Sequence, residues 1–212
     1  MQKAYLKKDT GKKFNYLLST PDNYDKSKES LPLIIFLHGA GERGEDPWVI
    51  NRNGIAFLFD KESPVRAVTL SPQCAEGKIW ITQVYDLKEL IDDIVEEYNI
   101  DKKRITITGL SLGGFGTWMM GYTFPDFFAA MAPVCGGGIS FGSEVLKDVP
   151  IRAFHGSADD VVPLVYSTLM VDHIRDHGGR AELVIYHGFG HDSWTNAYED
   201  SDLVYWLYKQ SK

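Results

Sequence analysis

The stretch Thr106-Ile107-Thr108-Gly109-Leu110-Ser111-Leu112-Gly113-Gly114 decides the fold of this chain. A β-branched apolar run, typical of a buried strand, ends in the pattern Gly-x-Ser-x-Gly, and residues 115–122 that follow have a helical pattern. A strand that turns abruptly into a helix brings backbones close together, so side chains at Gly109 or Gly113 would collide with them. The pattern therefore predicts a sharp strand–turn–helix junction. It holds the Ser111 hydroxyl exposed at the start of a helix, where free N–H groups favour negative charge.

Strand and helix patterns alternate along the rest of the chain. Residues 31–37 are an unbroken apolar run, as expected for a strand buried on both faces of a mainly parallel sheet. From Asp86 to Tyr98, apolar residues recur at helical spacing with acidic residues on the opposite face, which indicates a surface helix. The other expected strands are 5–8 and 14–18, paired as a hairpin, and 67–70, 100–111, 129–134, 151–155 and 181–186. The other expected helices are 115–122, one that runs from Pro163 to Gly178, and 194–208, whereas 51–60 is either a loop or a short helix.

This alternation predicts an α/β fold in which helices flank a mainly parallel sheet. The 212 residues, 44% of them apolar, suffice for one large domain with a substantial core, and we expect residues 1–212 to form that domain. The connection between residues 134 and 150 is too short for a large cap domain. A site at the ends of the strands is therefore expected to be open.

Composition and charge argue against several classes of protein. A net charge of −7 argues against nucleic-acid binding, which needs a basic surface. No apolar run approaches the length of about 18 residues that a membrane span needs. Residues 1–5 include no apolar signal segment, so we expect a cytoplasmic protein, although a secreted protein with a trimmed signal peptide would have the same sequence. Cys74 and Cys135 lack metal or redox spacing and are expected to be buried thiols, and neither a metal nor a cofactor is expected.

Polar residues follow three of the predicted strands, at the edge where open parallel sheets hold their reactive groups. Ser111 ends one strand, Asp159 and Asp160 follow another, and His187 and His191 follow the last. A serine hydroxyl becomes an effective nucleophile when a histidine removes its proton and a carboxylate orients that histidine. The sequence therefore predicts a Ser-Asp-His triad, with Asp159 and Asp160 both candidates for the acid.

Two histidines near the last strand compete for the role of base. His187 lies so close to the end of the strand that it has little freedom, whereas Gly188 and Gly190 allow the chain to carry His191 back over Ser111. We therefore expect His191 to be the base. The remaining histidines are expected to be structural or at the surface: His38, His155, His173 and His177.

The same chemistry needs N–H donors for the negative charge that develops on the substrate oxygen. Leu112, directly after Ser111, is one candidate. The second donor is expected from the glycine-rich loop 38–44, with Ala40 as the first choice and Gly41 as the alternative.

Four motifs of the chain resemble those of the α/β-hydrolase superfamily, and within it the compact serine esterases related to dienelactone hydrolases, phospholipase/carboxylesterases and feruloyl or acetylxylan esterases. They are Leu37-His38-Gly39-Ala40-Gly41-Glu42-Arg43-Gly44, Gly109-Leu110-Ser111-Leu112-Gly113-Gly114-Phe115-Gly116, His155-Gly156-Ser157-Ala158-Asp159-Asp160-Val161-Val162-Pro163 and Gly190-His191-Asp192-Ser193-Trp194. The resemblance implies the α/β-hydrolase fold and Asp159 as the triad acid. Dienelactone hydrolases proper use cysteine where this chain has Ser111, so the resemblance does not extend to their activity.

The residues and the resemblance together predict a serine carboxylic-ester hydrolase that acts through an acyl-enzyme on a small-molecule ester. An open site favours short-chain or aromatic acyl groups, such as acetyl or feruloyl, on a sugar or another small alcohol. Gly41, Trp80 and Trp194 are candidate substrate-binding residues, with core packing an equal alternative for both tryptophans. A peptidase or thioesterase with the same triad is the alternative enzyme, and a binding protein that keeps the fold without the chemistry is the non-enzymatic alternative.

Overall fold

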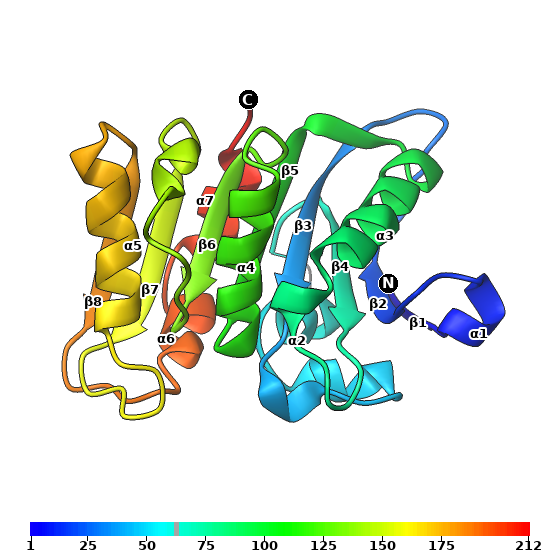
Figure 1. Ribbon diagram of the computed structural model, residues 1–212. Coiled ribbons are helices and arrows are strands. Elements are labelled where there is room, and N and C mark those ends of the chain that lie inside the picture. The colour runs from blue at the N-terminus through cyan, green and yellow to red at the C-terminus, as the bar shows by residue number, and fades with distance from the viewer. Residues whose placement is uncertain (62–63) are drawn as a thin grey trace.

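One eight-stranded sheet with helices on both faces organises the computed structural model, which describes residues 1–61 and 64–212 (Figure 1). The strands are ordered β1-β2-β4-β3-β5-β6-β7-β8. Strands β3 to β8 are parallel to one another, whereas β2 is antiparallel to both of its neighbours, β1 and β4. The predicted α/β fold with a mainly parallel sheet is confirmed.

The strands and helices follow the apolar patterns of the sequence. The strands are β1 (Gln2–Tyr5), β2 (Asn15–Ser19), β3 (Leu31–Leu37), β4 (Val68–Gln73), β5 (Ile100–Leu110), β6 (Ala130–Val134), β7 (Ile151–Gly156) and β8 (Ala181–Tyr186). The α-helices are α1 (Lys7–Thr10), α2 (Gly54–Lys61), α3 (Val84–Glu97), α4 (Leu112–Thr123), α5 (Val165–Asp176), α6 (Trp194–Glu199) and α7 (Leu203–Lys209). Short 3₁₀ helices are η1 (Ala40–Glu42), η2 (Pro47–Arg52), η3 (Trp80–Thr82) and η4 (Ser143–Leu146).

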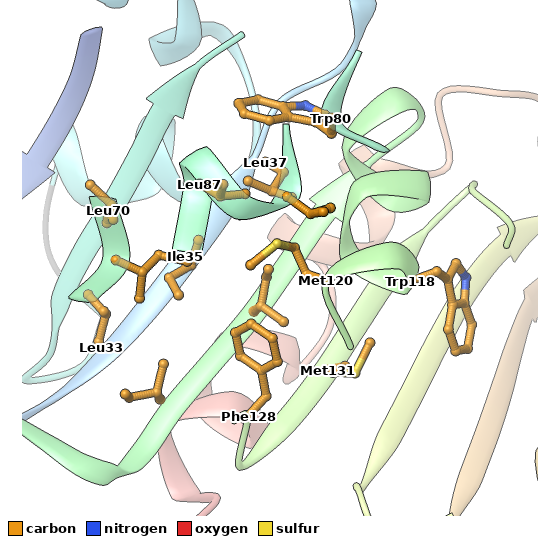
Figure 2. Close-up of a cluster of buried hydrophobic side chains, with 14 of the residues drawn as sticks. Leu33, Ile35, Leu37, Leu70, Trp80, Leu87, Trp118, Met120, Phe128 and Met131 are labelled. Atoms are coloured by element: carbon orange, nitrogen blue, oxygen red, sulfur yellow. The ribbon is translucent and has the colours of Figure 1, made fainter. Parts of the chain in front are cut away.

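Strand β3 supplies side chains to the cores on both faces of the sheet. Leu33, Ile35 and Leu37 belong to the core formed with α3, α4 and α5, and Figure 2 shows them beside labelled residues of β4, α3 and α4. Ile34 and Phe36, at the alternate positions, belong to the core formed with α2, α6 and α7. Every residue of β3 is buried, as the unbroken apolar run predicted.

The prediction of one helix over residues 194–208 is wrong. Helix α6 ends at Glu199 and α7 begins at Leu203. The Ser201 hydroxyl donates to the carbonyl of Ala197 at 2.6 Å and accepts from the N–H of Leu203 at 3.1 Å. One serine therefore bonds to the end of the first helix and to the start of the second, in competition with a continuous helix.

Two other connections differ in detail from the predictions. The predicted strand 5–8 is wrong apart from Tyr5, because β1 covers Gln2–Tyr5 and Lys7–Thr10 form the short helix α1, which Gly11 caps with a φ of 71°. Strands β1 and β2 still pair as an antiparallel hairpin, with Tyr5 opposite Tyr16. The ambiguous segment 51–60 contains the end of η2 and most of α2. Between β6 and β7 the connection holds only η4, so the site beyond the strands has no large cap.

Two further observations concern membrane-spanning helices and the cysteines. Within the described residues, no helix combines the length and the apolar character that crossing a membrane requires. Cys74 and Cys135 are both buried free thiols, as predicted.

Candidate active site

Ser111 occupies a strained turn between β5 and α4. Its backbone has a φ of 53° and a ψ of −116°, a conformation that costs a residue with a side chain about 1–3 kcal/mol. The turn is pressed against the neighbouring strands: a Cβ on Gly113 would lie 1.8 Å from the carbonyl oxygen of Leu37, and one on Gly109 would lie 2.4 Å from the carbonyl oxygen of Gly113. Glycine is therefore required on both sides of Ser111, for the steric reason that the sequence pattern indicated.

Three side chains from three strand exits form a continuous hydrogen-bonded chain. Ser111 Oγ lies 2.8 Å from His191 Nε2, and His191 Nδ1 lies 2.8 Å from Asp159 Oδ2. Because an ionised carboxylate only accepts hydrogen bonds, Nδ1 carries the imidazole proton and Nε2 is free to accept from the Ser111 hydroxyl. The structure thus brings together the three residues that the sequence selected, in the arrangement that general-base activation of a serine needs.

Asp159 is held in place by backbone as well as by His191. Its Oδ1 accepts hydrogen bonds from the N–H groups of Val161 and Val162, at 3.0 and 2.8 Å. Burial by itself would raise the pKa of Asp159, but the hydrogen bonds from His191 and from the two N–H groups outweigh it and lower the pKa. His155 Nε2 lies 3.2 Å from Asp159 Oδ2, and burial lowers the pKa of this histidine. Asp159 is therefore an ionised, fixed acceptor for His191 at neutral pH.

The loop after β8 carries His191 back over the sheet by contact with the loop after β7. Gly188 has a φ of 79°, and its N–H donates to Ser157 Oγ at 2.8 Å. The carbonyl of Phe189 accepts from the N–H of Ala158 at 2.9 Å. These contacts fix the loop that bears the imidazole to the loop that bears the carboxylate. His187 is exposed and lies outside the triad.

The residues that bear the predicted oxyanion N–H groups lie at the serine turn and on the neighbouring loop after β3. Leu112 is the first residue of α4, so its N–H has no acceptor one turn earlier in the helix. Ala40 is the first residue of η1, directly after Gly39. A Cβ on Gly39 would lie 3.7 Å from the Cβ of Ser111, which places the loop after β3 against the serine. Both N–H groups are therefore positioned beside the turn that holds the hydroxyl.

His38 orients the peptide that carries the Ala40 N–H. Its Nε2 accepts from the N–H of Cys74 at 2.9 Å, so Nδ1 bears the proton and donates to the carbonyl of Gly39 at 2.6 Å. The described peptide bonds are all trans, so the Ala40 N–H points opposite to that carbonyl. Burial lowers the pKa of His38 to about 4, which keeps the ring neutral and this pattern of donors intact.

Two further residues beside the site were not among the predicted site residues. Cys135, with a φ of 40°, places its Sγ 3.3 Å from the N–H of Ser111. Glu42, buried in η1, accepts from Asn53 Nδ2 at 3.2 Å, and its other carboxylate oxygen would touch a Cβ on Gly39 at 3.3 Å. The sequence signal for Cys135 was its place directly after an apolar strand, and that for Glu42 was its place in the glycine-rich loop 38–44.

The three candidate substrate-binding residues lie in different surroundings. Trp80 is fully buried and donates its indole N–H to the carbonyl of His38 at 3.0 Å, so it belongs to the core shown in Figure 2 and does not line the site, contrary to one expectation. Trp194 is partly exposed and contacts His191 edge-to-face, with ring centroids 5.3 Å apart. Gly41 is exposed on η1.

Asp160, the other candidate for the triad acid, lies outside the hydrogen-bonded chain, in which Asp159 bonds to His191. Asp160 is exposed and does not cap α5, which begins at Val165 and has no side-chain cap. Among the described residues, no group of three or more His, Cys, Asp or Glu side chains is arranged to hold a metal ion.

Comparison with known proteins finds relatives among esterases and thioesterases. The model of the phospholipase/carboxylesterase family matches residues 68–202. A bifunctional acetylxylan esterase/xylanase of Neocallimastix patriciarum is 28% identical over 138 residues, which are 62% of this chain and 20% of that protein. An acyl-protein thioesterase 1 homolog of Dictyostelium discoideum is 24% identical over 192 residues, covering 76% of this chain and 83% of that protein.

Solved structures agree with this assignment. The crystal structure of a thermostable esterase superimposes with a TM-score of 0.88 at 34% identity, and covers 100% of this chain and 63% of the other. The chain thus spans less than two thirds of that esterase and a fifth of the acetylxylan esterase/xylanase. The family model nevertheless includes β5, the serine turn, and the loops of Asp159 and His191. The chain therefore belongs to the phospholipase/carboxylesterase family and has the α/β-hydrolase fold.

Proposed function

We propose that the protein is a serine carboxylic-ester hydrolase that works through an acyl-enzyme. The observation that carries this proposal is the unbroken chain of hydrogen bonds from Ser111 through His191 to Asp159, with both distances 2.8 Å. A serine activated in this way attacks the carbonyl of a carboxylic ester, and esterases are prominent among the relatives.

In the acylation step, Ser111 Oγ attacks the ester carbonyl while its proton moves to His191 Nε2. Asp159 stabilises the imidazolium that forms, because its carboxylate already bonds to the protonated Nδ1. The carbonyl oxygen becomes an anion, which the N–H groups of Ala40 and Leu112 would bind. Each such donor is commonly worth about 3 kcal/mol of transition-state stabilisation.

The first tetrahedral intermediate then collapses: the C–O bond to the alcohol breaks, His191 gives its proton to the departing alcohol oxygen, and the acyl-enzyme is complete. Deacylation uses the same groups with water in place of Ser111. A water molecule enters, His191 removes its proton, and the hydroxide attacks the acyl carbon. Collapse of this second tetrahedral intermediate releases the carboxylic acid and returns the proton to Ser111 Oγ.

We infer short-chain or aromatic acyl groups, of the acetyl or feruloyl type, on a sugar or another small alcohol. Support comes from the short connection between β6 and β7, which leaves the site without a large cap that would enclose a long acyl chain. The relative that combines acetylxylan esterase and xylanase supports a carbohydrate alcohol. Trp194, beside the imidazole, is a candidate wall for the bound ester.

The test is hydrolysis of p-nitrophenyl acetate by Ser111→Ala and His191→Ala, with His187→Ala as the matched control. We expect the first two variants to fold and to lose at least about 10⁴-fold in kcat, because each removes a member of a unit that acts together. His187→Ala, which changes an exposed histidine on the same loop, is expected to match the parent. Parent-level hydrolysis by folded Ser111→Ala would refute the proposal.

A thioesterase is the second candidate, favoured by the match to the acyl-protein thioesterase homolog over most of both chains. The same triad can also cleave peptides. Three substrates with one acyl group and an ester, thioester or amide linkage distinguish these reactions. We expect the highest kcat/KM on the ester, and a thioester preference of tenfold or more would reassign the function.

A further inference from the structure

A cavity of about 430 Å³ lies away from the triad, between the end of β1 and the segment that leads into η2. Its lining includes Tyr5, Asp9, Glu45, Asp46 and Trp48. This volume is within the range of small-molecule sites in proteins. None of these residues takes part in the hydrogen-bonded chain of the triad.

The cavity opens on the same edge of the sheet as Ser111. Strand β1 is antiparallel to β2, which is antiparallel to β4, so β1 ends at the edge where the parallel strands end. Because β1 lies four strands from β5, the cavity is on the order of 19 Å from the serine. Figure 1 shows the chain after β3 running along this edge toward β1.

One segment of the chain, residues 40–48, connects the loop beside Ser111 to the cavity. Ala40, the proposed oxyanion donor, begins η1, and the chain then continues through Arg43 and Gly44 to the cavity residues Glu45 to Trp48. Gln73 fixes the path, since its Nε2 donates to the carbonyls of Glu42 and Asp46, at 3.0 and 2.8 Å. A long substrate on this edge would meet both sites at once.

The side chains in the cavity suit a carbohydrate. Trp48 is 48% exposed, and an exposed indole face packs well against the C–H groups of a sugar ring. Two carboxylates beside it are held by the protein: Glu45 by Lys7 and Asn15, and Asp46 by the N–H of Trp48. Fixed carboxylates accept hydrogen bonds from hydroxyl groups, and the lining has three acids and, among its described residues, no basic one, which disfavours an anionic ligand.

We propose that this cavity is a subsite for the neutral oligosaccharide chain of a polymeric ester substrate, with Trp48 as its platform. The proposal rests on the proposed ester hydrolysis at Ser111. The reacting ester occupies the triad, while sugar residues several units along the same chain occupy the cavity. Small aryl esters reach only the triad and do not use it.

Binding tests the cavity independently of catalysis. Unesterified xylohexaose is titrated calorimetrically into the parent, Trp48→Ala, Trp48→Phe and Phe141→Ala, where Phe141 is an exposed aromatic residue elsewhere on the surface. We expect Trp48→Ala to bind at least about tenfold more weakly, Trp48→Phe to retain most of the affinity, and Phe141→Ala to match the parent. Equal binding by Trp48→Ala, or no binding by the parent, would overturn the proposal, as would tighter binding of an anionic galacturonate hexamer.

Kinetics separate failure of the subsite from failure of the proposed function. We expect Trp48→Ala to lower kcat/KM on acetylated xylo-oligosaccharides at least about fivefold and to leave hydrolysis of p-nitrophenyl acetate unchanged. Unchanged kcat/KM on both substrates would refute the subsite alone. If the parent binds xylohexaose through Trp48 but cleaves neither ester, the subsite stands and ester hydrolysis fails.

Discussion

The two halves of the carboxyl edge of the sheet are built in contrasting ways. Where β3, β5, β7 and β8 end, backbones interlock: Gly113 lies against Leu37, and a Cβ on Gly156 would touch the carbonyl oxygens of Phe189 and Gly190, at 2.4 and 2.3 Å. Where β1 ends, the cavity is bordered by exposed side chains, among them Glu45 and Trp48.

This difference matches the two proposed roles: ester hydrolysis where β3, β5, β7 and β8 end, called the reaction half below, and binding of a polymeric substrate where β1 ends, called the recognition half. Hydrogen bonds to Asp159 and His38 come largely from backbone or from buried neighbours, so these side chains are fixed before substrate arrives. Such preorganisation is what lowers a reaction barrier. The exposed residues near β1 can adapt to a flexible polymer. Changes in the first half should therefore affect stability and kcat, whereas changes in the second should affect only large substrates.

The largest effect is expected from Asp159→Asn. An amide removes the charge that stabilises the imidazolium and accepts poorly from the His191 Nδ1–H, so kcat on p-nitrophenyl acetate should fall by about 10⁴-fold. Asp160→Asn changes the exposed neighbour and should leave kcat unaltered. Equal rates for the two variants would show that the carboxylate at 159 does not orient the base.

Gly113→Ala is expected to have the next largest effect. Its Cβ would lie 1.8 Å from a backbone oxygen of β3, a contact that side-chain rotation cannot relieve. We predict a loss of at least about 4 kcal/mol in the free energy of unfolding, measured by urea denaturation. Gly41→Ala, which meets nothing within 4 Å, should change it by less than about 1 kcal/mol. A small effect of Gly113→Ala would contradict the close backbone contact between the serine turn and β3.

Acid should destabilise the protein because His38 is buried in its neutral form. Burial lowers the pKa of this histidine from 6.5 to about 4 in the folded protein, so the unfolded chain binds more protons between these values. Stability therefore falls as pH falls through this window, by about 3 kcal/mol for this residue. His38→Gln should lose less stability than the parent between pH 7 and pH 4. Parallel stability curves for the two proteins would contradict a buried neutral His38.

The smallest effect is expected from Glu45→Gln in the recognition half. The ion pair of Glu45 with Lys7 is exposed, with side chains 65% and 43% accessible, and such pairs contribute at most about 1 kcal/mol. The free energy of unfolding and the hydrolysis of p-nitrophenyl acetate should both stay close to the parent values. A large drop in either would show that the two halves of the edge are coupled.

Much of the reaction half could be predicted from the sequence because its constraints are local. An unbroken apolar run defines β3, and the glycines around Ser111 record close backbone contacts within a few residues. The competition between His187 and His191 was resolved by glycines in the same loop. The structure places each of the three triad residues as the pattern expected, and their catalytic roles remain predictions.

The features that the sequence did not predict depend on single side chains or on contacts between segments far apart in the chain. The burial of Trp80 arises from packing against Phe14 and from a hydrogen bond to His38, neither of which leaves a periodic signal. The break between α6 and α7 depends on a single hydroxyl, that of Ser201. The cavity beside β1 requires the β1–β2 hairpin to lie against the segment before η2, and Asn15 joins the two by donating to the carbonyl of Glu45 at 2.9 Å.

The most direct test of the central claim is covalent labelling with a fluorophosphonate, followed by peptide mapping. A nucleophilic serine activated by His191 should carry the adduct at Ser111 in the parent and in His187→Ala, and labelling should be nearly abolished in His191→Ala. An adduct on another residue, or labelling of His191→Ala at the parent rate, would contradict the claim that Ser111 and His191 act as nucleophile and base.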